Sequence, residues 1–91
     1  MKERATAAAI AYAGRVGMAL CEPVPGGFHA VDGERDVFVV VTARKSTGEA
    51  AVTLTARRHA QREERRLDHI IVRVLSADRA LLRHHRDVPT E

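Results

Sequence analysis

The chain has 91 residues, enough for one domain and too few for a second hydrophobic core. Hydrophobic residues make up 45% and charged residues 30%, which is typical of a globular chain and excludes a disordered one. The formal net charge is +3, and no apolar run approaches the roughly 20 residues of a membrane-spanning helix, so we expect no membrane partner.

The first predicted element is a helix over residues 3–16, with Gly17 as its C-terminal stop. The basic start and the alanines superficially look like a signal peptide. Because Tyr12 and Arg15 interrupt the apolar stretch, we assign it instead to the folded domain. The apolar residues that recur at helical spacing are Ala5, Ala9, Tyr12 and Val16.

Three short strands are predicted next, over residues 18–24, 28–31 and 37–41. Glycine-containing turns at residues 25–27 and 32–33 separate them, and the second turn is an Asp-Gly hairpin signal. The third strand, VFVVV, is a continuous apolar run. Such a run indicates burial on both faces and therefore a central place in the sheet.

The single cysteine, Cys21, falls on the first of these strands. One cysteine cannot form an intramolecular disulfide or a zinc site of several thiolates, so the expected location is the reducing cytoplasm. We expect Cys21 to be a small buried side chain.

The second half of the chain predicts a helix and one more strand. Residues 44–50 form a loop, and Thr53 can cap a helix over residues 54–66. The last strand covers residues 67–77, followed by a short helix or turn and a frayed tail over residues 84–91. The inner face of the helix is predicted to be Ala56, Ala60 and Leu67, and its outer ridge Arg58, Arg62 and Arg65.

The predicted order is therefore α-β-β-β-α-β. A helix between two strands of this kind calls for a mixed sheet flanked by helices, so we expect one α/β domain over residues 1–91 with its core at residues 3–77.

Two local patterns accompany that order. Asp32-Gly33 is followed by VFVVVTAR at residues 37–44, and AVTL at residues 51–54 precedes a basic run. Together with the spacing of Ala9, Tyr12 and Gly17, these residues resemble the restriction-endonuclease-like PD-(D/E)XK superfamily, whose core is α-β-β-β-α-β. Within it, the chain is most similar to the small YraN family of predicted nucleases.

The resemblance implies carboxylates on two adjacent strands that hold Mg²⁺, and a lysine two residues after the second acid. None of the corresponding positions here carries a carboxylate or an amine. The resemblance therefore implies a degenerate nuclease domain without catalytic or metal-binding residues and without a cofactor. The vacated positions are Thr6, Pro25, Gly27, Val40 and, for the lysine, Thr42.

Other acids and histidines do not combine into a replacement site by their spacing. Three acids near the hairpin are expected to solvate the turn: Asp32, Glu34 and Asp36. Three histidines are expected to be isolated, and two to lie in the tail: His29, His59 and His69, and His84 and His85.

Positive charge is concentrated late in the chain. Residues 57–91 hold nine arginines against six acids, and five of these arginines fall between Arg57 and Arg66. Such an excess indicates either a polyanionic partner or a solvated helix face.

Three functions remain open. The first is nucleic-acid binding without catalysis, through the duplex backbone, because three aromatic residues supply little base stacking. The second is a protein-protein or homodimer interface at residues 69–75, if this strand lies at a sheet edge. The third is an active nuclease with a displaced site, the one case that requires Mg²⁺. The candidate phosphate contacts are Arg44, Lys45, Arg57, Arg58, Arg62 and Arg65.

Overall fold

The computed structural model describes residues 2–43, 52–76 and 79–90. Their strands form one five-stranded sheet in the order β1-β2-β3-β4-β5, in which β3 and β4 are parallel and the other neighbours are antiparallel. The elements are α1 (Lys2–Arg15), β1 (Met18–Val24), β2 (Gly27–Asp32), β3 (Arg35–Ala43), α2 (Leu54–Arg62), β4 (Arg66–Ser76) and β5 (Arg79–His85). The predicted α/β class and the mixed sheet are confirmed, and the predicted order α-β-β-β-α-β is followed by one further strand, β5.

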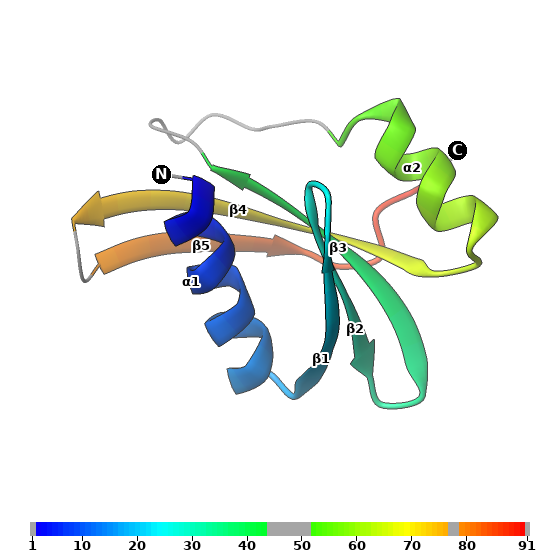
Figure 1. Ribbon diagram of the computed structural model, residues 1–91, viewed down its shortest axis with the longest axis horizontal. Helices are drawn as coiled ribbons and strands as arrows, with labels where there is room; N and C mark the ends of the chain where they lie inside the picture. Colours follow the sequence, from blue (N-terminus) through cyan, green and yellow to red (C-terminus); the bar gives the residue numbers. More distant parts are fainter. Residues whose placement is uncertain (1, 44–51, 77–78, 91) are drawn as a thin grey trace.

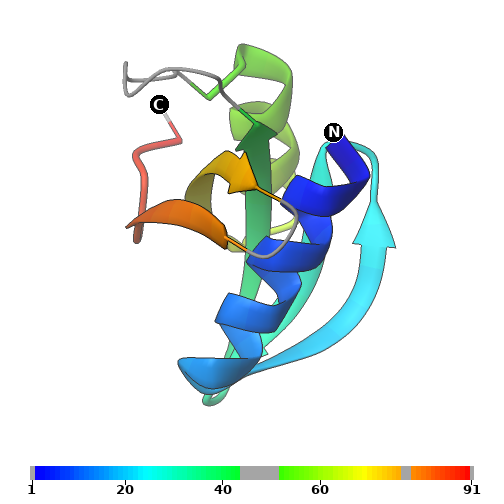
Figure 2. The same ribbon diagram turned by 90° about the vertical axis from the view of Figure 1, so that its left-hand side faces the viewer.

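The two helices cover opposite faces of the sheet. Successive residues of β3 alternate between the faces, so Val39 and Val41 pack with α1 while Phe38 packs with α2. The helices lie well apart in Figure 1, and Figure 2 shows α1 passing in front of the strands. The central place of β3 and its burial on both faces agree with the prediction from its apolar run.

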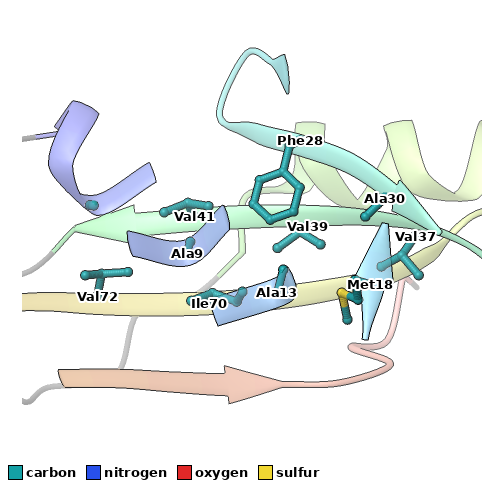
Figure 3. Packing of buried hydrophobic residues seen from close by; sticks show 11 residues of the cluster. Ala9, Ala13, Met18, Phe28, Ala30, Val37, Val39, Val41, Ile70 and Val72 are labelled. Atoms are coloured by element: carbon teal, nitrogen blue, oxygen red, sulfur yellow. The ribbon is translucent and has the colours of Figure 1, made fainter. Parts of the chain in front are cut away.

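Small side chains allow α1 to lie close to the sheet. Ala5 and Ala9 are fully buried and Ala13 is nearly so, whereas Val16, predicted on the same face, is 37% exposed. Gly17 ends the helix in the left-handed region, with φ of 96°. Figure 3 shows Ala9 and Ala13 of α1 among the larger side chains of the strands, including Phe28, Val39, Val41 and Ile70.

The helix α2 is shorter than predicted. The Thr53 hydroxyl caps it by accepting a hydrogen bond from the Ala56 amide at 3.2 Å, as expected. It ends at Arg62, because Glu64 takes a φ of 54° and the Arg65 amide then donates back to the Ala60 carbonyl at 2.9 Å. Leu67 consequently belongs to β4, and the prediction of a helix to residue 66 was wrong.

The prediction for the C-terminal part of the chain was also wrong. Residues expected to form a turn and a tail form β5, which lies along β4 at the edge of the sheet (Figure 1). Ala80 and Leu82 alternate inward and pack against the α1 core, which explains the strand. Since β4 is paired on both sides, it is not the edge strand that the homodimer hypothesis required.

Cys21 is exposed rather than buried. It lies where the pairing of β1 with β2 shifts, between Leu20 and Glu22, so it has no partner in the register of the described strands. Among the described residues, no helix is both long and apolar enough to cross a membrane.

Candidate functional site

The positions vacated in the predicted nuclease motif come together on the α2 side of the sheet. Gly27 of β2 pairs directly with Val40 of β3, and Thr42 lies two residues further along the same face. Pro25 is in the turn that leads into Gly27. Only Thr6 is separate, because it lies on α1 over the other face.

Gly27 cannot carry a side chain in this backbone. A Cβ atom built on it would lie 1.8 Å from the carbonyl oxygen of Val39, far inside any permitted contact. The close approach of β2 and β3 therefore excludes a carboxylate at the position where the resembling family has its aspartate.

A pocket of about 420 Å³ opens beside these positions, between β3, α2 and the β1–β2 turn. We call it the α2 pocket. Most of its lining is apolar, three threonines and one histidine supply hydrogen-bonding groups, and no described lining residue is an acid, lysine or arginine. The lining consists of Val24, Pro25, Gly26, Phe38, Val40, Val41, Thr42, Thr53, Thr55, Ala56 and His59.

Aromatic rings form part of the wall of the α2 pocket. The ring of Phe38 meets His59 at a centroid distance of 4.8 Å and His29 at 5.7 Å, both nearly perpendicular. His29 is only 7% exposed. The expectation that these histidines are isolated was wrong, because β2 and α2 bring together residues 30 positions apart.

Glu22, His29 and His59 form a hydrogen-bonded row. Glu22 Oε1 lies 3.1 Å from His29 Nδ1, and His29 Nε2 lies 3.3 Å from His59 Nε2. The irregularity at Cys21 places Glu22, rather than the cysteine, opposite His29 in the strand register. Bulges commonly redirect a side chain in this way next to functional sites.

The arginines predicted to contact phosphates do not form one ridge. Arg58 and Arg62 are exposed and lie one turn apart on α2, as predicted. Arg57 is half-buried. Arg65 follows the helix and lines a separate pocket with Arg35, so its place in the ridge was wrong. Arg44 and Lys45 lie outside the described residues.

The four described arginines of this segment have no ion pair within the described part of the chain. The Nε atoms of Arg57 and Arg65 are buried without a hydrogen-bond partner. Two exposed acids, Glu63 and Glu64, follow the helix and reduce the net charge of residues 54–65 from +4 to +2. The exposed, unpaired cations that remain on the helix itself are Arg58 and Arg62.

A second polar cluster lies on the α1 side and was not predicted. The fully buried carboxylate of Asp68 accepts two hydrogen bonds from Arg66, at 2.9 and 3.0 Å, and one from His84 at 2.8 Å. The Asp87 amide donates a fourth, at 3.0 Å. The other nitrogen of His84 lies 3.0 Å from the Tyr12 hydroxyl. His84 is therefore a core residue and not part of a tail.

Arg66 and Arg86 offset the negative charges of Asp68 and Asp32 in this cluster. Burial would raise the pKa of Asp68, but hydrogen bonds from Arg66, Asp87 and His84 outweigh burial and lower it. The pKa of Arg66 is raised, chiefly by its hydrogen bonds to Asp68 and Asp32. Asp32 lies 2.8 Å from Arg66, so the expectation that it only solvates the turn was wrong. Because both Asp68 oxygens are satisfied, the cluster is structural.

Thr42, at the position where the YraN family has its lysine, is also hydrogen-bonded. Its hydroxyl lies 2.8 Å from Nε2 of His69, which is 2% exposed. Burial, and then the nearby charge of His85, lower the pKa of His69, which favours its neutral form. The five vacated positions thus present no group that could activate water.

The comparisons with known proteins found no relative: no family model, no curated protein and no solved structure matches this chain. Within residues 2–43, 52–76 and 79–90, no group of three or more histidine, cysteine or acidic side chains is arranged to hold a metal ion.

Sequence reasoning singled out Pro25, Val40 and Thr42, which line the α2 pocket, only as vacated nuclease positions, and it missed the contact between His29 and His59. The one local signal was the alternation of Phe28, His29 and Ala30, which places His29 on the face opposite Phe28. His59 stands between Arg58 and Ala60, and nothing in that stretch predicts contact with His29.

Proposed function

We propose that this protein is a degenerate restriction-endonuclease-like domain, similar to the YraN family, that binds the phosphate backbone of nucleic acid and does not cleave it. The order α-β-β-β-α-β with parallel β3 and β4 supports this proposal. The direct pairing of Gly27 with Val40 supports it further, because the two acidic positions of the family would occupy adjacent strands at one point.

The observation that carries nucleic-acid binding is the pair of exposed guanidinium groups at Arg58 and Arg62, neither of which forms an ion pair with another described residue. Residues four apart on a helix lie about 6 Å apart at their Cβ atoms, so both can contact one strand of phosphates. Arginine suits this role because its planar fork binds phosphate oxygens in pairs. Such contacts depend on salt and are indifferent to base sequence.

Absence of cleavage follows from the residue types at the vacated positions. Gly27, Val40 and Thr42 supply neither a magnesium ligand nor a base. The single cysteine supports a cytoplasmic location for this proposed function.

Fluorescence anisotropy with a labelled 20-base-pair duplex, from low to physiological salt, tests binding. We expect affinity to fall steeply with salt, and Arg58→Ala with Arg62→Ala to reduce the log-log slope by about 1.8, since each phosphate contact contributes about 0.9. The matched control is Arg4→Ala with Arg15→Ala, which removes the same charge from exposed positions of α1 on the other face of the sheet. Equal losses in the two double variants would contradict the assignment of Arg58 and Arg62.

The nuclease alternative is tested by incubating the protein with Mg²⁺ or Mn²⁺ and branched, nicked or linear DNA. We expect the substrates to stay intact. Cleavage that disappears in Asp36→Ala would overturn the proposal and indicate a displaced site.

A further inference from the structure

Arg58 and Arg62 follow residues of α2 that line the α2 pocket. Thr55 and His59 of α2 both line the pocket. Arg58 is three residues after Thr55, and Arg62 is three residues after His59, so each arginine is the neighbour of a lining residue on the helix surface. A phosphate held by these arginines would therefore have the pocket beside it.

The row of Glu22, His29 and His59 gives His59 a defined orientation. The ring centroids of the two histidines are 5.5 Å apart, whereas their Nε2 atoms are 3.3 Å apart, so the rings meet by their nitrogen-bearing edges. The carboxylate of Glu22 can only accept a hydrogen bond, so His29 must carry a proton on Nδ1.

This edge-to-edge contact suits a shared proton and not a metal ion. A zinc ion in line between the two nitrogens would need them roughly 4 Å apart, since each Zn–N bond is about 2.0–2.1 Å. With neutral rings, His29 Nε2 accepts and His59 Nε2 donates. Nδ1 of His59 is then a free acceptor, and it has no hydrogen-bond partner in the described residues.

The pocket matches the chemistry of a nucleobase. A base is uncharged, flat and largely apolar on its faces, with N–H donors and carbonyl or nitrogen acceptors at its edge. The pocket combines an apolar floor at Val40, the ring of Phe38, an acceptor at His59 and the hydroxyl of Thr55, and its described lining has no charged side chain. A charged ligand group would find no counterion among the described lining residues.

From this geometry we infer that the α2 pocket takes one unpaired base of the nucleic acid whose phosphates Arg58 and Arg62 bind. This inference rests on the proposed function and narrows it to duplexes that contain an extrahelical base. Phe38 is only 4% exposed, so the half-buried ring of His59 is the more accessible aromatic group in the described lining on which a base could stack.

Three duplexes of one sequence separate the contribution of the base from that of the backbone: a perfect duplex, a duplex with a one-nucleotide bulge, and a duplex with an abasic bulge. We expect the base-containing bulge to bind at least about fivefold more tightly than the abasic bulge, because a stacked base contributes about 1 kcal/mol or more. The affinities for the three duplexes should depend on salt to the same extent.

Two phenylalanine variants on α2 test whether the preference for the base-containing bulge depends on the α2 pocket. Thr55→Phe places a ring at an exposed position that lines the pocket, and Gln61→Phe places the same ring at an exposed position that does not. We expect Thr55→Phe to abolish the preference for the base-containing bulge with duplex affinity unchanged, and Gln61→Phe to keep the preference.

The possible failures are distinguishable. Equal affinity for base-containing and abasic bulges, with salt-dependent binding of all three duplexes, overturns the pocket assignment and leaves the proposed function standing. A preference that survives Thr55→Phe also overturns the assignment. Absence of binding to all three duplexes at low salt overturns both proposals.

Discussion

Asp68 shows how one buried carboxylate can hold a small domain together. Two of its four hydrogen bonds come from Arg66 of the same strand, and the other two join β4 to β5 and to the segment after β5. His84 extends this network to Tyr12 on α1. A carboxylate buried to this degree is stable only while its partners remain in place. The ionised form is favoured, since its pKa is lowered by these hydrogen bonds despite burial.

Asp68→Asn should lower the free energy of unfolding by about 3–5 kcal/mol at pH 7, because it removes one partner of a buried ion pair. A carboxyl group whose folded pKa is depressed stabilises the protein above its unfolded pKa of about 3.9. That stability is lost as the pH falls through the folded pKa. Urea titrations from pH 7 to pH 3 should therefore show the difference between wild type and variant narrowing below about pH 4.

Asp36→Asn is the matched control for this measurement. Asp36 is exposed, and no described residue pairs with it. We expect its substitution to change the free energy of unfolding by less than about 0.5 kcal/mol. A loss at Asp36 as large as that at Asp68 would mean that the Asp68 cluster has no special role.

At the scale of elements, the contact between β2 and β3 decides what the candidate site can contain. The strands approach so closely at Gly27 that the oxygen of Val39 occupies the place of a side chain. The α2 pocket lies beside this contact, between β3, the N-terminal part of α2 and the β1–β2 turn.

Gly27→Ala should destabilise the protein by about 3 kcal/mol or more, because a backbone atom must move to admit the methyl group. Gly14→Ala should have the opposite effect on stability. That glycine lies in α1, a Cβ there would meet nothing within 4 Å, and alanine is the better helix former, so stability should rise by about 0.5–1 kcal/mol. Urea midpoints of the two variants measure both effects, and a tolerated Gly27→Ala would contradict the close approach of the strands.

At the scale of the whole molecule, β5 and the residues after it complete the core. The Val88 amide donates to the Leu67 carbonyl at 2.6 Å, and Val88 packs with the buried residues under α2. His84 and Leu82 serve the core on the other face. The C-terminal residues thus contribute to both layers of the domain.

A chain that ends at Ser76 should not fold cooperatively, because it lacks β5. The edge of β4 then has no neighbouring strand, and the carboxylate of Asp68 loses its hydrogen bond from His84. Circular dichroism during urea unfolding measures this. A chain that ends at Pro89 keeps every contact described for β5 and Val88, and should unfold with nearly the wild-type midpoint. A sharp transition in the shorter chain would contradict the role assigned to β5.

The sequence by itself determined the elements whose signals are local. The run at residues 37–41 requires burial on both faces, Gly17 and Thr53 mark helix ends, and Asp32-Gly33 makes a hairpin, so the mixed α/β sheet could be predicted without coordinates. Only the tertiary structure decided the rest. The strand β5 carries two arginines and two histidines, and it is a strand because Leu82 and His84 find partners in α1 and β4. The contact of His29 with His59 likewise depends on where α2 packs, and no spacing along the chain encodes that position.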